Sequence, residues 1–234
     1  MIKTATVAAP FSEVATKLIE QLISEGTKLV GFARVGDEQR GAELEANYKG
    51  AIQIVYGDMA DPESSNHMVA SAVELLGSIE AHYHCAGVFS WNHWQHVEPT
   101  EVARLFNANF QTAWCMSKAL VPAMLGESRS SMVFVSARDT SRFVGAGFGP
   151  YMASKMALNG LVESLATELI STNITVNAVQ PTIINTAVNR KALPDIDPAN
   201  FVDPAQMASI MIDISKPTRY QLSGALIPIN SGLI

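Results

Sequence analysis

Short apolar and β-branched runs alternate with longer segments of helical periodicity along the whole chain. Because the runs are continuously apolar, they predict a parallel sheet with helices on both faces, a doubly wound, Rossmann-like α/β fold of seven strands. Ligands of such sheets bind at the carboxyl ends of the strands. The expected strands span 4–8, 28–32, 52–55, 79–84, 132–135, 174–179 and 225–229, and the expected helices include 38–47, 62–76, 100–125 and 151–170.

No repeat, low-complexity tract or linker interrupts this pattern, so we expect one domain over residues 1–234. The two cysteines, Cys85 and Cys115, lie outside any Cys-x-x-Cys pattern, which favours a reducing compartment. No apolar stretch is long enough to cross a membrane, and the first residues lack the apolar region of a signal peptide. We therefore expect a soluble, cytoplasmic protein.

The charge balance argues against one large class of partner. The chain has 16 Lys and Arg against 22 Asp and Glu, a net charge of -6, and no basic run. Such a chain has no means of neutralising a phosphate backbone, so we expect a small-molecule substrate rather than nucleic acid.

The main chemical signal is Tyr151-Met-Ala-Ser-Lys155 at the head of an expected helix. A spacing of four stacks the phenol and the ammonium on one helix face. A nearby lysine is expected to lower the pKa of the phenol, which would help it act as a general acid towards a carbonyl. The alternative is an ordinary helical pair.

The strands and polar residues around this helix help to choose between a catalytic pair and an ordinary helical pair. The helix follows a strand that ends at Ser136 and precedes a strand that ends at Pro181, while Asp58 follows the third strand and Asn109 lies in a long helix. This arrangement resembles the short-chain dehydrogenase/reductase family over essentially the whole chain. The stretch after the sixth strand also resembles dihydropteridine reductase, more distantly.

The resemblance implies a role for each matching residue. Tyr151 would donate the proton, Lys155 would tune it and hold the nicotinamide ribose, Asn109 would anchor a water relay, and Ser136 would orient the carbonyl. The positions implied to contact the cofactor are Ser12, Arg34, Asp58, Ala86, Gly87, Lys155, Pro181, Ile184 and Thr186.

The first turn departs most from the family. Its three phosphate-loop glycines are replaced by Ala9, Glu13 and Ala15. Glycines there let backbone amides approach a pyrophosphate at a helix N-terminus, where Glu13 brings a carboxylate instead. Either Glu13 is a solvent-facing acid that stabilises the first helical turn, with Ser12 serving the phosphates, or it repels the cofactor.

Three further positions bear on the chemistry. His84-Cys85-Ala86-Gly87 replaces the family's Asn-Asn-Ala-Gly but keeps the small pair, and the catalytic serine falls nearest to Ala137, so Ser136 is the less secure assignment. Arg34 ends the second strand, where an arginine favours NADP(H) over NAD(H); the alternative is a solvated surface arginine. Asp58 matches an adenine contact or caps the next helix.

Four of the five histidines, His82, His84, His93 and His96, lie within fifteen residues. His82 and His84 point to one face of a strand, but no acid or cysteine completes a standard zinc spacing, so we expect no metal site. Aromatic residues interleave with them in the following loop, which indicates either an aromatic-lined substrate mouth or plain loop packing: Phe89, Trp91 and Trp94.

The sequence as a whole predicts an NADP(H)-dependent carbonyl reductase or alcohol dehydrogenase for a small, apolar or planar substrate. Two other functions stay open: a catalytically silent relative that acts as a binding or regulatory module, and a metal-dependent hydrolase. Apolar residues on the two long helices predict a homodimer or homotetramer: Ala113, Trp114, Ala119, Leu161 and Leu165.

Overall fold

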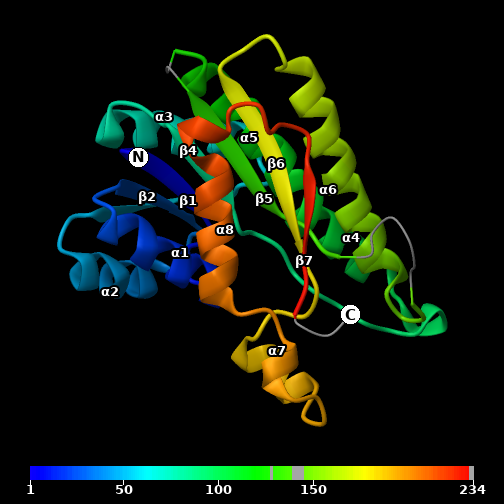
Figure 1. The fold of residues 1–234 in the computed structure, drawn as a ribbon. Helices are drawn as coiled ribbons and strands as arrows, with labels where there is room; N and C mark the ends of the chain where they lie inside the picture. The colour runs from blue at the N-terminus through cyan, green and yellow to red at the C-terminus, as the bar shows by residue number, and fades with distance from the viewer. Residues whose placement is uncertain (127–128, 139–144, 232–234) are drawn as a thin grey trace.

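The computed structural model describes residues 1–126, 129–138 and 145–231. A seven-stranded sheet of order β3-β2-β1-β4-β5-β6-β7, with every neighbouring pair parallel, forms its centre (Figure 1). The strands are β1 (Thr4–Ala8), β2 (Lys28–Ala33), β3 (Ile52–Tyr56), β4 (Ala81–His84), β5 (Ser130–Val135), β6 (Ile174–Pro181) and β7 (Leu226–Ile229). The expected parallel sheet of seven strands is confirmed.

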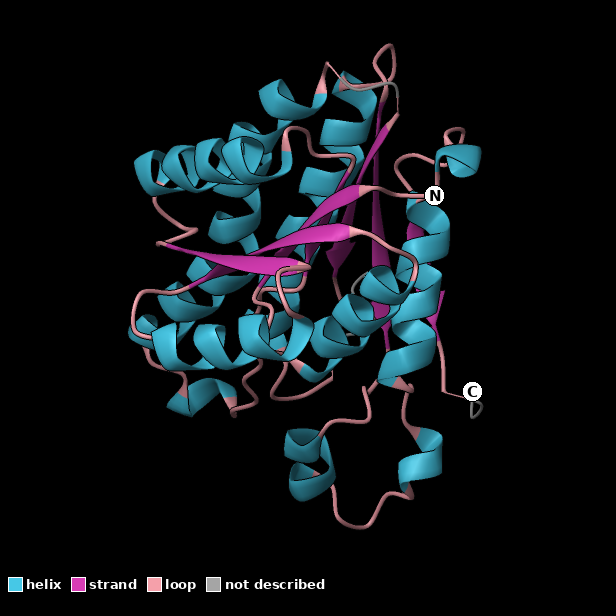
Figure 2. Ribbon diagram, turned by 90° about the vertical axis from the view of Figure 1, so that its left-hand side faces the viewer, coloured by secondary structure: helices cyan, strands magenta, loops and turns pink. Residues whose placement is uncertain are grey.

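Helices cover both faces of the sheet (Figure 2). One face packs against α1 (Glu13–Ser24), α2 (Glu38–Tyr48) and α8 (Pro204–Ser215). The other face packs against α3 (Pro62–Leu76), α5 (Thr112–Met124) and α6 (Gly149–Glu168). Successive strand residues alternate between these two cores, as Val133 and Phe134 of β5 show.

The long helix expected at 100–125 is present over Pro99–Met124, but one of its turns is π-helical. The chain forms α4 (Pro99–Phe106), a π-helical turn (Asn107–Gln111) and then α5. A π-turn accommodates an extra residue within a helix, and here it carries Asn109, whose side chain leaves the helix to bond the loop after β4. Periodicity alone does not report such a bulge.

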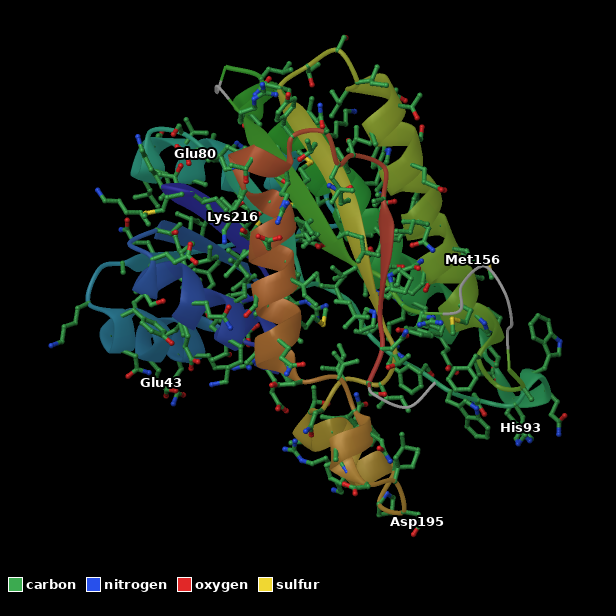
Figure 3. All side chains as sticks on the ribbon, in the orientation of Figure 1. Glu43, Glu80, His93, Met156, Asp195 and Lys216 are labelled. Carbon is green, nitrogen blue, oxygen red and sulfur yellow. The ribbon has the colours of Figure 1, made fainter. Side chains whose placement is uncertain are left out.

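The connections between these elements carry the remaining short helices. A 3-10 turn (Trp94–His96) follows β4, and the segment from β6 to α8 projects from the body of the molecule (Figure 1). That projection carries α7 (Ala187–Ala192) and a 3-10 turn (Pro198–Asn200), with a third 3-10 turn (Pro217–Arg219) after α8. Figure 3 shows Asp195 at the outer end of the projection. Among the described residues, no helix combines the length and apolarity needed to cross a membrane.

Candidate active site

The first two turns of α6 carry Tyr151 and Lys155, and the strand that precedes this helix is β5. The Lys155 side chain is buried, and its ammonium donates a hydrogen bond to the Val135 carbonyl oxygen at 2.8 Å, at the carboxyl end of β5. Burial lowers the pKa of Lys155 to about 8, while the neighbouring Cys85 thiol acts weakly in the opposite direction. The Lys155 ammonium thus lies at the carboxyl end of the sheet, where the Val135 carbonyl dipole stabilises its charge.

Tyr151 is half-buried beside the ring of Phe89, which meets it edge-on at 4.9 Å between ring centres. Burial raises the pKa of Tyr151 to about 12. The expected lowering of this pKa by the lysine is therefore not seen, because desolvation dominates and the Lys155 ammonium is bonded to the Val135 carbonyl. At neutral pH the phenol keeps its proton.

Asn109 is fully buried and joins three elements of the site. Its side-chain oxygen accepts from the Val88 backbone N–H at 2.7 Å, and its amide nitrogen donates to the Val88 carbonyl at 3.0 Å and to Ser154 Oγ at 2.9 Å. Ser154 in turn donates to the Tyr151 carbonyl at 2.7 Å. Asn109 therefore ties the loop after β4 to the first turn of α6. Ser154, inside the Tyr-x-x-x-Lys motif, was not predicted as a site residue.

Gly87 shows that Asn109 and Lys155 are neighbours. A Cβ atom added to Gly87 would lie 2.9 Å from Asn109 Oδ1 and 3.1 Å from Lys155 Nζ. Any larger residue would therefore displace both groups. The close approach explains physically why a glycine is needed at position 87.

The structure places Ser136 differently from its expected role. The residue is buried, and its hydroxyl donates to Asn159 Oδ1 at 2.6 Å, deeper along α6 than Tyr151. Ala137, the other candidate position, has no hydroxyl. The structure thus brings Tyr151, Lys155 and Asn109 to one place, but commits the Ser136 hydroxyl to the support of α6.

A cleft of about 280 Å³ lies at the carboxyl ends of β1, β2 and β4. Four expected cofactor contacts line it, Ser12, Arg34, Ala86 and Gly87, together with Arg40 and Thr112, which the sequence did not single out. Since Gly87 also lies beside Lys155 and Asn109, the cleft extends from the two arginines to the neighbourhood of these two residues.

The glycine-poor first turn keeps the backbone of a glycine turn. Ala9 adopts φ 55°, the left-handed conformation that usually requires glycine, at an expected cost of about 1 kcal/mol. Ser12 caps α1 by accepting from the Ala15 N–H at 3.1 Å, so its own hydroxyl hydrogen stays available to a ligand oxygen.

Glu13 is exposed in the first turn of α1, and it makes one contact that the sequence did not predict. Its carboxylate accepts a hydrogen bond from the Ala187 backbone N–H, at 2.6 Å, at the start of α7. The replacement of a glycine by a glutamate thus creates a link between α1 and the projecting segment.

Two arginines lie at the β2 end of the cleft. Arg34 is exposed, and the Arg40 guanidinium stacks over the Phe11 ring at 4.5 Å while it contacts Asp37 Oδ1 at 3.3 Å. Sequence analysis could not identify Arg40 as a residue of the cleft, because its position there depends on how α2 packs beside the first turn.

Four other expected cofactor contacts lie outside the lining of the cleft. Asp58 does not cap α3; its carboxylate accepts from the Ala60 N–H at 2.9 Å, whereas Asp61 is the cap. Pro181 ends β6, Ile184 bridges to Val202, and Thr186 caps α7 by accepting from the Asn189 N–H. None of these four lines the cleft as the structure has it.

The histidines do not form one cluster. His82 and His84 are fully buried in β4, whereas His93 and His96 are exposed, and Figure 3 shows His93 at the edge of the molecule. In the parts of the chain that the structure describes, no group of three or more His, Cys, Asp or Glu residues is placed to hold a metal ion.

Comparison with known proteins identifies the family of this chain. The family described as short chain dehydrogenase matches residues 3–197. The chain belongs to this family. It is an NAD(P)-dependent short-chain dehydrogenase/reductase, and such enzymes carry out carbonyl reduction or the reverse oxidation with a nicotinamide cofactor.

Two curated relatives are similar over nearly the whole chain. The 3-oxoacyl-[acyl-carrier-protein] reductase of Vibrio cholerae is 23% identical and aligns over 99% of this chain and 97% of its own. The 3-alpha-(or 20-beta)-hydroxysteroid dehydrogenase of Mycobacterium tuberculosis is also 23% identical, over 99% and 89%.

Solved structures share the fold. ElxO with NADP bound superposes with a TM-score of 0.89 at 19% identity, covering 99% of this chain and 98% of that one. A 3-ketoacyl-(acyl-carrier-protein) reductase from Brucella melitensis complexed with NADH gives 0.86 at 17% identity, covering 98% and 97%.

Proposed function

We propose that this short-chain dehydrogenase/reductase uses NADP(H) to reduce a small, apolar or planar carbonyl compound, or to oxidise the corresponding alcohol, with Tyr151 as the proton donor. The observation that carries the proposal is the continuous cleft, which has Arg34 and Arg40 at one end and meets Lys155 at Gly87. Tyr151 lies one helical turn from Lys155.

The residues of the cleft fit a dinucleotide. Ala9, Ala86 and Gly87 leave space for flat rings, and Ser12 at the N-terminus of α1 offers a hydroxyl to phosphate oxygens. Lys155 and Asn109 lie at the far end, suited to a ribose hydroxyl and an ordered water. When bound there, the nicotinamide supplies or accepts the hydride.

The chain's own residues handle the proton. With a pKa near 12, the Tyr151 phenol is protonated at neutral pH and can give its hydrogen to an oxygen that gains negative charge. Lys155, with a pKa of about 8, is mostly charged at pH 7 and stabilises that negative charge electrostatically.

Aromatic side chains favour an apolar substrate. Phe89 is 56% exposed beside Tyr151 and lies 6.0 Å from the Phe148 ring. Trp91, 48% exposed, donates its indole N–H to the Ala146 carbonyl, which fixes the ring near the start of α6. These faces offer a planar or apolar molecule a surface to bury.

Substitution of Tyr151 by Phe tests the proton donor. Tyr151→Phe keeps the ring against Phe89 but removes the hydroxyl, so kcat should fall about a hundredfold or more. NADPH oxidation with a panel of aldehydes and ketones measures it, and Tyr48→Phe is the matched control on α2. If Tyr151→Phe turns over every accepted substrate as fast as the parent, another group donates the proton.

The two arginines test the cofactor preference. An arginine binds the 2′-phosphate that only NADP(H) carries, so Arg34→Ala and Arg40→Ala should each weaken NADPH binding about tenfold and leave NADH binding nearly unchanged. Fluorescence titration with both cofactors gives the ratio, with Arg219→Ala, an exposed arginine paired with Asp213, as control. An equal loss for NADPH and NADH, or no loss, contradicts the preference.

A further inference from the structure

A chain of hydrogen bonds crosses the core of the sheet from β1 to α5. Thr6 Oγ1 lies 2.8 Å from His82 Nδ1, His82 Nε2 lies 3.3 Å from His84 Nδ1, and His84 Nε2 lies 3.2 Å from Thr112 Oγ1. All four side chains are buried, and Thr112 also lines the cofactor cleft.

The direction of every bond in this chain follows from its last member. The Thr112 hydroxyl donates to the Ala108 carbonyl at 2.9 Å, and a hydroxyl has one hydrogen, so Thr112 must accept from His84 Nε2–H. Burial lowers the pKa of His84, which is therefore neutral and accepts at Nδ1 from His82 Nε2–H. His82, whose pKa burial lowers to about 3, accepts at Nδ1 from the Thr6 hydroxyl.

Both histidines are thus neutral Nε2–H tautomers in a fully satisfied network. Such networks specify one arrangement, because any break leaves a buried polar atom without a partner. The surroundings do not require imidazoles: the rings of Phe32 and Phe134 pack around them at 5.6 to 6.4 Å. An aromatic hydrocarbon would fill the same space without the network.

The chain ends at the turn that holds Asn109. Ala108, whose carbonyl receives the Thr112 hydroxyl, precedes Asn109 in the π-turn Asn107–Gln111. A π-turn departs from the regular helical bonding pattern, so a side-chain donor to its backbone helps to hold its shape. His84, by fixing the Thr112 hydroxyl, fixes the direction of that donor.

We propose that His84 is a positioning residue for the active site: through Thr112 and the Ala108 carbonyl it holds the π-turn that places Asn109 between Val88 and Ser154. The catalytic part of this inference rests on the proposed function, in which Asn109 serves the proton relay. Thr6 and His82 continue the hydrogen-bonded chain from His84 to β1 on the same face of the sheet.

Two variants of His84 that differ by one methylene test the proposal. In His84→Gln the amide nitrogen is as far along the side chain as Nε2 and still donates to Thr112, whereas in His84→Asn it is too short to reach. We expect kcat of His84→Gln within about threefold of the parent and kcat of His84→Asn lower by about tenfold or more, with KM changed less, because a small displacement of a relay group slows the chemical step. Equal kcat values for the two variants would overturn the proposal.

A second measurement needs no activity. In the cofactor-free protein, imidazole ¹⁵N signals should show two Nε2–H tautomers, and the Asn109 side-chain amide signals, assigned by their loss in Asn109→Ala, should move in His84→Asn and in the milder Thr112→Val. They should stay in place in Thr6→Val, which breaks the chain at its far end. Unmoved Asn109 signals in both His84→Asn and Thr112→Val would overturn the positioning role. If no carbonyl compound is turned over at all, the proposed function fails while these signals still decide the role of His84.

Discussion

Lys155 shows how burial and charge compete at a single residue. The side chain is 4% exposed, and the Val135 carbonyl gives its ammonium one strong acceptor. Desolvation nevertheless lowers the pKa from 10.5 to about 8, so the charged form is less stable in the folded protein than in water. The site thus holds a lysine whose charged form is destabilised by burial.

This competition predicts a pH-dependent stability. Because the folded-state pKa lies below the unfolded value, the unfolded chain binds more protons between pH 8 and 10.5, and the free energy of unfolding rises with pH in that window. Below pH 8 Lys155 is charged in both states, and its burial then lowers the free energy of unfolding by about 3 kcal/mol. Lys155→Met should therefore be more stable than the parent at pH 7, by about 2 kcal/mol after the loss of one hydrogen bond.

By pH 11, where both states of the parent are mostly neutral at this residue, the stability difference should have moved by about 3 kcal/mol, which makes the parent more stable than Lys155→Met by about 1 kcal/mol. Urea unfolding at several pH values measures the difference, and Lys216→Met, at an exposed lysine near Asp213, serves as control. A difference that stays constant with pH contradicts the lowered pKa.

At the scale of elements, the contact between Glu13 and Ala187 joins α1 to α7. Glu13 stands beside Ser12 at the N-terminus of α1, where the proposed cofactor phosphates would lie, and its carboxylate instead holds the start of α7. The carboxylate of Glu13 bonds the projecting segment through the Ala187 N–H, and its negative charge would oppose a phosphate bound at Ser12.

Two substitutions separate these effects. A carboxylate about 4 Å from a phosphate charge opposes binding by about 1 to 4 kcal/mol, depending on the effective dielectric constant. Glu13→Gln removes the charge but keeps an oxygen for the Ala187 N–H, so it should tighten NADPH binding about tenfold, less at high salt. Glu13→Gly should tighten it similarly but also loosen α7.

NADPH titrations at two salt concentrations, with proteolysis of the segment 182–203 as a measure of its order, check both effects. If Glu13→Gln binds NADPH as the parent does at low salt, the carboxylate does not face the phosphates. If Glu13→Gly is digested no faster than Glu13→Gln, the bond to Ala187 does not anchor the segment.

At the scale of the whole molecule, the outer faces of α5 and α6 remain partly apolar. Trp114 is 37% exposed with Lys118 over its ring, and Leu161 and Leu165 are half-buried. Ala113 was expected to add to this apolar surface, but it is fully buried in the core. That assignment was wrong, because Ala113 faces the sheet while its neighbour Trp114 faces outward. Trp114, Leu161 and Leu165 still leave apolar side-chain area exposed on both helices, which a second copy of the chain could cover.

Association through this surface is a prediction. The parent should sediment as a dimer or tetramer, and Trp114→Glu should shift it towards monomer, because a charge placed in an apolar interface is not solvated. Leu75→Glu, on the exposed side of α3, is the control and should not change the mass. Sedimentation of the parent as a monomer at working concentrations contradicts the prediction.

The fold was predictable from the sequence because its signals are local and repeated. Continuously apolar strands between helical segments require a sheet buried on both faces, and α3 lies at the expected residues 62–76. Strand bounds differ by two residues at the start of β5 and at the end of β6, since these residues pair with neighbours that periodicity does not reveal. The spacing of Tyr151 and Lys155 likewise follows from helix geometry alone.

The tertiary structure decided the features that depend on residues distant in sequence. It turned the Ser136 hydroxyl to Asn159, placed Arg40 beside the cleft, and bonded Glu13 to Ala187, 174 residues away. It also joined His82 and His84 to threonines of β1 and α5, where the sequence showed only two histidines on one strand face. Side-chain identity determines which bonds a residue can make, but the partner that is close enough to make them is set only when the strands and helices have packed.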